Sequence, residues 1–459
     1  MSERRSIVQN NDYMLTGSIS KSIVKFAVPL FFGNLFQQLY NTADSLIVGR
    51  VLGNTELAAV SSTGMLIFLL VGFFQGIGLG AGVVVSQFFG AKDTKNIRLS
   101  IHTYLTFSLI IGAFLTVAAT LLAPIILQWM GTPREVMPDA VEYIRVYFMG
   151  SLALVMYNAC MGIMQAVGDS KHPLYYLIVS SLINVVLDII LIACFGFGVW
   201  AAALATVISQ FVSVFLCLLR LFRSDEEYSV RLKELTLNPR MLGMIMRIGL
   251  PSGVQNSIIA FANVVVQSNI NYFGEMAMAG CGAYSKIEGF AFLPITSFTA
   301  AITTFVGQNL GAGNKERVKK GARFGLICSL IIAEIIGVLF YIFARFLISA
   351  FTDEPEAILY GVQKAQTCAL FYFLLAATHS FASVLRGAGK SVFPMLTMLV
   401  CWCVIRVGFL LIVVPITQTI HAVNWVYPLT WSLSTITLFI YYLVNDWSDS
   451  SITKKGKSL

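Results

Sequence analysis

Long uncharged hydrophobic stretches follow one another along almost the whole chain. Each exceeds the roughly 20 apolar residues that a helix needs to cross about 30 Å of hydrocarbon. Backbone in lipid must satisfy its own hydrogen bonds, and these runs are continuous rather than alternating, so they predict membrane-spanning helices and not a barrel. The runs without Asp, Glu, Lys or Arg are 57–91, 99–133, 189–219, 248–274, 289–314 and 407–445.

Dividing this pattern at its polar breaks predicts twelve transmembrane helices. Residues 1–20 are polar without a cleavable signal, and the apolar stretch after them is too long for a signal peptide. The predicted fold is therefore an all-α polytopic membrane protein. The twelve predicted spans are about 22–49, 57–89, 99–129, 138–166, 172–195, 199–222, 243–271, 277–309, 321–347, 358–385, 392–414 and 423–445.

Composition agrees with a protein dissolved in lipid. Hydrophobic residues make up 57% of the 459 residues and charged residues only 12%, whereas soluble domains are about 25% charged. The eight cysteines form no CxxC pair, and His102, His172, His379 and His421 are scattered, so we expect no metal site apart from a possible Na⁺ site. No catalytic constellation is present, so we expect no enzyme.

The net charge of +8 is explained by topology. Basic residues concentrate in alternate loops, such as 220–240 and 315–323, while the other loops keep little beyond Arg50 and Arg134. The positive-inside rule then predicts a cell-membrane protein with both termini in the cytoplasm. Nucleic-acid binding is not expected.

The two halves of the chain resemble each other. Three pairs of segments align at an offset of 221 or 222 residues: 85–93 with 306–314, 165–173 with 386–394, and Pro29 with Pro251. The repeat predicts an N-terminal six-helix bundle at 1–222, a cytoplasmic linker at 223–240 and a C-terminal six-helix bundle at 241–459. Because six is even, the bundles are expected to be parallel, related by an axis along the membrane normal, which suits alternating access. The segment 386–391 lacks the first glycine of a phosphate-binding loop, so an ion gradient is the expected energy source.

Acids inside predicted spans are the strongest functional signal, because a carboxylate in lipid is costly. Asp44 shares a helical face with Tyr40 and Asn41, and Asp188 shares one with Asn184. Each acid can load a proton or hold Na⁺ with other oxygens; the alternative is a buried acid that only hydrogen-bonds across helices. Their counterparts in the second half are apolar, so the predicted ion site belongs to the first half.

The acids of the second half are open to two interpretations. Glu288 either lines a substrate cleft and meets a cationic compound, or pairs with Lys286 or Arg406. Glu334 has no polar neighbours in sequence and is expected to be structural or peripheral. The other candidate cleft residues are Asn41, Asn158 and His379.

The spans, the repeat, Pro29, the sequence YNTAD ending at Asp44 and NVVLD ending at Asp188 together resemble the multidrug and toxic compound extrusion (MATE) family. The resemblance covers residues 20–445. It implies a cation-coupled antiporter that exports organic, often cationic and amphipathic, compounds in exchange for H⁺ or Na⁺, with no other cofactor. Its partners would be small organic substrates and the lipid bilayer, and we expect a monomer.

The sequence further resembles the DinF-type branch of that family, because residues 252–270 lack the acid of NorM-type members. In that branch the resemblance assigns the cation site to Asp44, Asn184, Asp188 and Thr206, with Tyr40 at the tyrosine position of the first helix. The branch often has proline after the second aspartate, where this chain has Ile189.

Other classes of function fit less well. A dedicated metabolite exporter of the same fold remains an alternative. A flippase for lipid-linked saccharides would need a more cationic interior than Lys286 and Arg406 provide. A channel would carry ion currents that are not coupled to solute.

Overall fold

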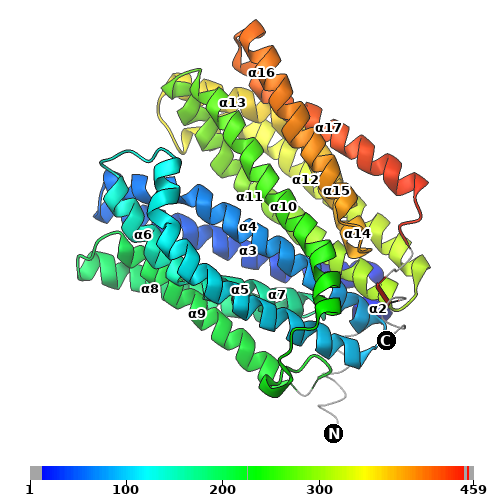
Figure 1. Ribbon diagram of the computed structural model, residues 1–459. Coiled ribbons are helices and arrows are strands. Elements are labelled where there is room, and N and C mark those ends of the chain that lie inside the picture. Colours follow the sequence, from blue (N-terminus) through cyan, green and yellow to red (C-terminus); the bar gives the residue numbers. More distant parts are fainter. Residues whose placement is uncertain (1–12, 225, 449–451, 454–459) are drawn as a thin grey trace. The chain divides into compact units, whose positions relative to one another are not determined.

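The computed structural model describes residues 13–224, 226–448 and 452–453, and within these residues the secondary structure is helical without strands (Figure 1). The helices of the first half are α2 (Tyr13–Thr16), α3 (Ile19–Val51), α4 (Asn54–Gly90), α5 (Thr94–Trp129), α6 (Met137–Met149), α7 (Ser151–Ala166), α8 (Lys171–Asp188), the π-helix η1 (Ile189–Cys194) and α9 (Trp200–Arg223). Those of the linker and second half are η2 (Leu232–Glu234), α10 (Pro239–Asn271), α11 (Glu275–Gly311), α12 (Lys315–Ser349), α13 (Pro355–Cys368), η3 (Ala369–Phe371), α14 (Tyr372–Gly387), α15 (Val392–Met398), the π-helix η4 (Leu399–Ile405), α16 (Arg406–Thr417) and α17 (Ile420–Val444).

The all-α fold predicted from hydropathy is confirmed. Ten helices or continuous helical segments of the described residues are long and apolar enough to cross a membrane. The predicted span 138–166 is the bent pair α6 and α7, whose axes differ by 48°, and it raises the number to eleven. The last predicted span corresponds to α17, which is helical over 25 residues but is not among these candidates.

Gly150 lies at the bend between α6 and α7. A Cβ atom at this position would lie 2.4 Å from Cγ2 of Val207 on α9. Contact this close between two elements requires a residue without a side chain, since real Cβ atoms do not approach other atoms to this distance. The bend therefore coincides with a close approach of this pair to α9.

The described chain forms two compact units. Unit 1 comprises residues 32–249, and unit 2 comprises residues 13–31 together with 250–448. These units differ from the predicted bundles because each unit contains part of α3 and part of α10. The boundary lies shortly after Pro29 in α3 and just before Pro251 in α10. Helices of 33 residues are long enough to pack one end in each unit. Hydropathy does not predict this division, because the division depends on which other helices each end of α3 and α10 contacts.

Contacts within each unit show why the helix ends belong where they do. In unit 2, the carbonyl oxygen of Met14 accepts hydrogen bonds from Asn309 Nδ2 and Arg317 Nη2, each at 3.1 Å. In unit 1, a Cβ on Gly249 would lie 2.9 Å from the backbone of Ile77 on α4. The beginning of α10 therefore packs directly on α4, and the N-terminal part of the described chain packs on α11 and α12.

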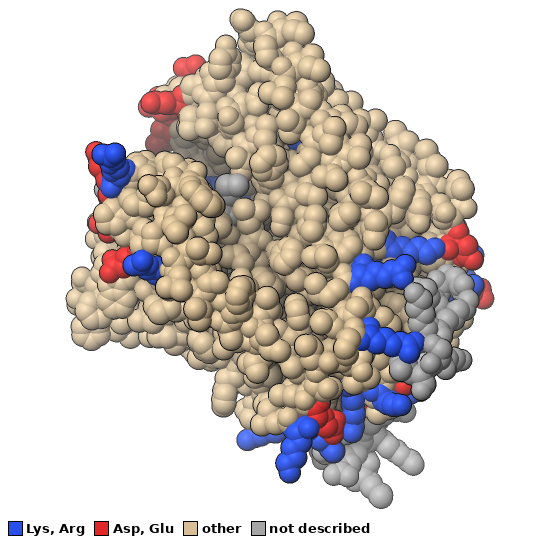
Figure 2. Space-filling view, viewed as in Figure 1, with Lys and Arg blue, Asp and Glu red and all other residues tan. Residues whose placement is uncertain are grey.

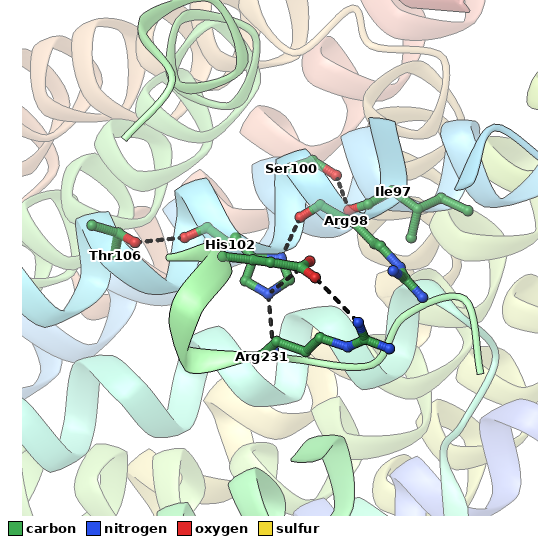
Figure 3. Close-up of polar contacts among 7 residues, drawn as sticks. Ile97, Arg98, Ser100, His102, Thr106 and Arg231 are labelled. Atoms are coloured by element: carbon green, nitrogen blue, oxygen red, sulfur yellow. Dashed lines mark hydrogen bonds and ion pairs between the residues drawn. The ribbon is translucent and has the colours of Figure 1, made fainter. Parts of the chain in front are cut away.

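The linker between the halves is held on α5 by His102 (Figure 3). His102 Nδ1 lies 2.7 Å from the carbonyl oxygen of Arg98, and the backbone N–H of Arg231 donates to His102 Nε2 at 3.0 Å. Because a carbonyl only accepts, these bonds place the ring proton on Nδ1. A carboxyl oxygen of Glu234 lies 3.6 Å from Arg231 Nη1, which adds an ion pair within the linker. His102 is therefore a docking residue for the linker.

The surface is that of a protein surrounded by lipid. Figure 2 shows charged side chains near the helix ends and a wide face between them that carries almost none. Among the candidate membrane-spanning helices, α5 and α12 are the least buried. Only 17% of the most apolar segment of each lies inside the protein. Large side chains such as Phe114 on α5 and Phe346 on α12 are largely exposed, which is favourable only in an apolar solvent.

Candidate cation-binding site

The two aspartates of the first half lie together within unit 1. Asp44 is on α3, and Asp188 is the last residue of α8, with 0% of its surface exposed. Their side chains interact with each other, although 143 residues of chain separate them. Two carboxyl groups in contact at a site shielded from water repel each other when both are ionised. The pair is therefore stable only when it shares a proton or binds a cation.

The oxygens around this pair lack donors. Both carboxyl oxygens of Asp188, Oδ1 of Asp44 and Oδ1 of Asn184 are buried and accept no hydrogen bond from the described residues. Asn184 Nδ2 donates to Thr206 Oγ1 at 3.4 Å, and Thr206 Oγ1 donates to the carbonyl of Ala202 at 3.1 Å. The Asn184 amide and the Thr206 hydroxyl therefore donate to groups other than the two carboxyl groups. A cluster of carboxylate and amide oxygens without donors suits a proton or a hard monovalent cation.

A change of helix type follows the second aspartate. The α-helix of α8 ends at Asp188, and the chain continues as the π-helix η1 from Ile189 to Cys194. π-Helical turns are rare and occur frequently at functional sites. The sequence comparison identified Ile189 as a departure from the common proline, and the structure shows that a wider helical turn lies at this position.

Two tyrosines lie within electrostatic range of the carboxyl pair, and a third packs on one of them. Tyr40 lies within electrostatic range of Asp44 and Asp188 and hydrogen-bonds to the side chain of Gln37. Tyr143, on α6, is within range of the same two acids and of Tyr40. Tyr147 stacks on Tyr143 with ring centroids 6.3 Å apart. The sequence analysis included Tyr40 and missed the other two, whose i, i+4 spacing on α6 was the available signal.

The candidate substrate residues are divided between the units. Asn41 is on α3 and Asn158 on α7 in unit 1, whereas Glu288 on α11 and His379 on α14 are in unit 2. Asn158 Nδ2 donates to the carbonyl of Leu154 on its own helix at 2.8 Å. His379 lies between the rings of Phe292 and Trp402, at centroid distances of 5.2 and 5.7 Å. Their grouping into one cleft stays a prediction.

Glu288 belongs to a polar cluster within unit 2. It accepts a hydrogen bond from the Tyr284 hydroxyl at 3.1 Å, and that hydroxyl lies 2.8 Å from the hydroxyl of Tyr372. Among the described residues no ion pair joins Glu288 to Lys286 or Arg406. Lys286 is exposed, with its ammonium 5.8 Å from the ring of Phe351.

The sequence reading named Lys286 and Arg406 as the basic residues near the interior, and this was wrong for Lys286. The buried bases among the described residues are Lys364, Arg386 and Arg406, which are 2%, 7% and 1% exposed. Lys364 Nζ lies 5.3 Å from the ring centroids of both Tyr284 and Tyr427. Such cation–π contacts contribute about 0.5–2 kcal/mol each, less than the several kcal/mol lost on burying an ion. Lysine 364 was missed because its flanking residues are those of an ordinary helix end.

An internal repeat of apolar helices and acidic residues within those helices are both typical of membrane transporters. The MatE family model matches the chain twice, over residues 29–190 and 251–412. The chain therefore belongs to the multidrug and toxic compound extrusion (MATE) family. The two matches begin 222 residues apart, which confirms the internal repeat.

Known proteins with the same organisation agree. The chain is 29% identical over 449 residues to the probable multidrug resistance protein YoeA of Bacillus subtilis, covering 95% of this chain and 96% of YoeA. It is 27% identical to the probable multidrug resistance protein NorM of Thermotoga maritima, covering 82% of each. A crystal structure described as MATE in complex with MaL6 superimposes with a TM-score of 0.87 at 25% identity, covering 97% of this chain and 99% of that one.

Family membership defines the class of activity. The protein is a multi-pass transporter of the cell membrane in the multidrug efflux class, and it is not an enzyme. Transporters of this family are ion-coupled and carry small organic substrates.

Proposed function

We propose that this transporter exports organic, often cationic and amphipathic, compounds in exchange for H⁺ or Na⁺ bound by Asp44, Asn184, Asp188 and Thr206, with Tyr40 beside them. The observation that carries this proposal is the contact between the wholly buried carboxyl group of Asp188 and the partly buried carboxyl group of Asp44, whose neighbouring oxygens lack donors among the described residues. One bound cation compensates the excess negative charge of this pair.

Exchange follows from competition for that charge. When the site opens to a cation-rich exterior, the ion binds, neutralises part of the pair and weakens its attraction for a cationic substrate. The substrate then dissociates, the protein changes from its outward-facing to its inward-facing state, and the ion is released to the cytoplasm. Each monovalent cation that moves inward releases about 2.3 kcal/mol of free energy per 100 mV of membrane potential. Coupling requires only that ion and substrate favour opposite states of the protein.

The assignment to the DinF-type branch is part of the proposal. It is supported by the two aspartates of the first half and by the absence of any acid from residues 252–270 of α10. We further propose that the protein acts as a monomer with both termini in the cytoplasm, as the distribution of basic residues between its loops indicates.

Transport in proteoliposomes tests this function. Efflux of a fluorescent organic cation is measured with a proton gradient alone, with a sodium gradient alone, and with neither. We expect one gradient to drive efflux, which identifies the coupling ion, and we expect the variant carrying both Asp44→Asn and Asp188→Asn to lose it. Equal efflux under all three conditions, or gradient-driven efflux by the double variant, would contradict the proposal.

A further inference from the structure

Unit 2 contains more buried positive than negative charge. Lys364 on α13 and Arg406 on α16 approach the same aromatic ring, with Nζ of Lys364 5.3 Å and Cζ of Arg406 4.8 Å from the centroid of Tyr427. No carboxylate of the described residues lies within 4.0 Å of either base. Glu288 is the acid within electrostatic range of both, so the cluster of two bases and one acid carries an excess of one positive charge.

The same region has hydrogen-bond donors without acceptors. The Lys364 ammonium lies over the rings of Tyr284 and Tyr427. Arg406 donates through Nη2 to Thr430 Oγ1 at 2.8 Å, but its Nε has no partner within the described chain. Asn424, on α17, is 0% exposed, and neither atom of its side-chain amide has a partner there.

These groups belong to one neighbourhood. Asn424 lies one helical turn before Tyr427, whose ring both bases approach. The backbone carbonyl of Asn424 accepts from Cys368 Sγ at 3.7 Å, and Cys368 lies one turn after Lys364 on α13. Lys364, Arg406 and Asn424 therefore come from three elements that meet around Tyr427. Buried donors of this number normally have acceptors.

We propose that Lys364, Arg406 and Asn424 form a binding site for an anionic group, either a small inorganic anion such as chloride or the carboxylate of an organic solute. An anion supplies both features that the cluster lacks, a compensating negative charge and acceptors for the unpartnered donors. The rings of Tyr427 and Trp402, on which the bases lie, provide apolar walls for an aromatic carboxylate. A cationic ligand is disfavoured here by the like charge of both bases.

This site shares no residue with the proposed cation site, because all its residues belong to unit 2 and Asp44 and Asp188 belong to unit 1. Anion binding therefore does not rest on the proposed exchange mechanism. In a protein that carries Asp188→Asn, we expect the anion affinity to be that of the unaltered protein. Loss of efflux with intact anion binding would separate a failure of one proposal from a failure of the other.

The test is anion binding by the purified full-length protein in detergent. The protein is equilibrated in potassium gluconate, whose anion is too large and hydrated for a buried site, and is titrated with potassium chloride or potassium benzoate. Binding is followed by calorimetry and by tryptophan fluorescence, because Arg406 lies 5.1 Å from the ring of Trp402. Saturable binding of chloride alone identifies an inorganic anion, and saturable binding of benzoate that chloride displaces identifies a carboxylate site.

Two variants, one that removes a positive charge and one that removes a negative charge, should change the anion affinity in opposite directions. We expect Lys364→Met to weaken binding of the anion at least tenfold and Glu288→Gln to strengthen it, because the first removes attraction and the second removes repulsion. Lys286→Met removes an exposed base from the same helix as Glu288 and should leave the affinity unchanged. Lys364→Arg retains the charge and preserves binding should Lys364→Met fail to fold. Absence of saturable binding of both anions, or equal affinities of the Lys364→Met, Glu288→Gln and unaltered proteins, would overturn the proposal.

Discussion

At the scale of single residues, the environment of each carboxyl group determines what it can do. Asp188 is wholly buried and its oxygens have no donors among the described residues, whereas Glu288 accepts a hydrogen bond from Tyr284 and lies within range of two bases. A carboxylate without compensation must take up a cation, while one near bases is already compensated. The two acids therefore have different expected roles, although both lie within predicted spans.

We predict that Asp188→Asn reduces gradient-driven efflux at least tenfold while the protein still inserts and folds. An amide of the same shape can neither take up a proton nor supply a full negative charge to Na⁺. Efflux from proteoliposomes measures the effect, with protein amount and melting temperature determined in parallel. Glu334→Gln, which neutralises a partly exposed acid on α12, is the control and should transport normally. Near-normal efflux by Asp188→Asn would exclude it from the ion site.

Asp44→Asn should have a similar effect, because the two acids are proposed to bind one ion. If they act as a unit, the double variant loses no more activity than either single variant. A double loss equal to the product of the single losses would instead show that the two acids act separately. The comparison is made on efflux rates at equal protein density.

Thr206→Val tests the polar neighbour of Asn184. Valine keeps the shape of threonine but removes the oxygen that accepts from Asn184 Nδ2, and a hydrogen bond between neutral groups contributes about 0.5–1.5 kcal/mol. We expect the ion concentration at half-maximal efflux to rise about two- to tenfold, with the maximal rate retained. Ser209→Ala, on the same helix, removes a hydroxyl that bonds only within its helix and should change neither quantity.

At the scale of elements, close helix contacts in unit 2 depend on glycine. A Cβ atom on Gly280 of α11 would lie 2.0 Å from the carbonyl oxygen of Ala357 on α13, whereas nothing lies within 4 Å of a Cβ on Gly282. The two glycines lie two residues apart on one helix, so one faces a neighbouring backbone and the other does not.

Substitution of these glycines by alanine should therefore have unequal effects. We predict that Gly280→Ala lowers the stability by about 1–3 kcal/mol, the usual cost of overpacking, since the backbones of α11 and α13 must separate. Gly282→Ala should leave the stability equal or slightly raised, because alanine is the better helix former. Melting temperatures in detergent measure both, and equal melting temperatures for the two variants would show that this contact does not limit the packing.

At the scale of the whole molecule, the distribution of charge predicts the orientation in the membrane. The linker is expected in the cytoplasm, and the loop between α5 and α6 is expected outside. In a protein whose eight cysteines are replaced, we predict that Lys233→Cys reacts with an impermeant maleimide only in inside-out vesicles. Glu135→Cys should react only in right-side-out vesicles. Both side chains are exposed, so burial does not limit labelling. The opposite pattern would reverse the topology.

The sequence by itself determined the class of fold, the positions of the helices and the internal repeat. These features are local or additive: a segment that can cross a membrane is recognised by its own length and hydropathy, and a repeat by aligned residues. Asp44 and Asp188 were likewise evident, because an acid in an apolar run is costly wherever its helix packs. The family match over both halves agrees with this reading.

Only the tertiary structure decided which residues share a site. The side chains of Tyr143 and Lys364 lie in ordinary sequence surroundings, and their roles arise from the α6 and α13 neighbours that they contact. The division of α3 and α10 between the units and the π-helix after Asp188 also depend on packing between distant segments. Hydropathy records whether a residue suits lipid, but the charge balance of a buried cluster depends on which helices meet, and that is fixed by long-range packing alone.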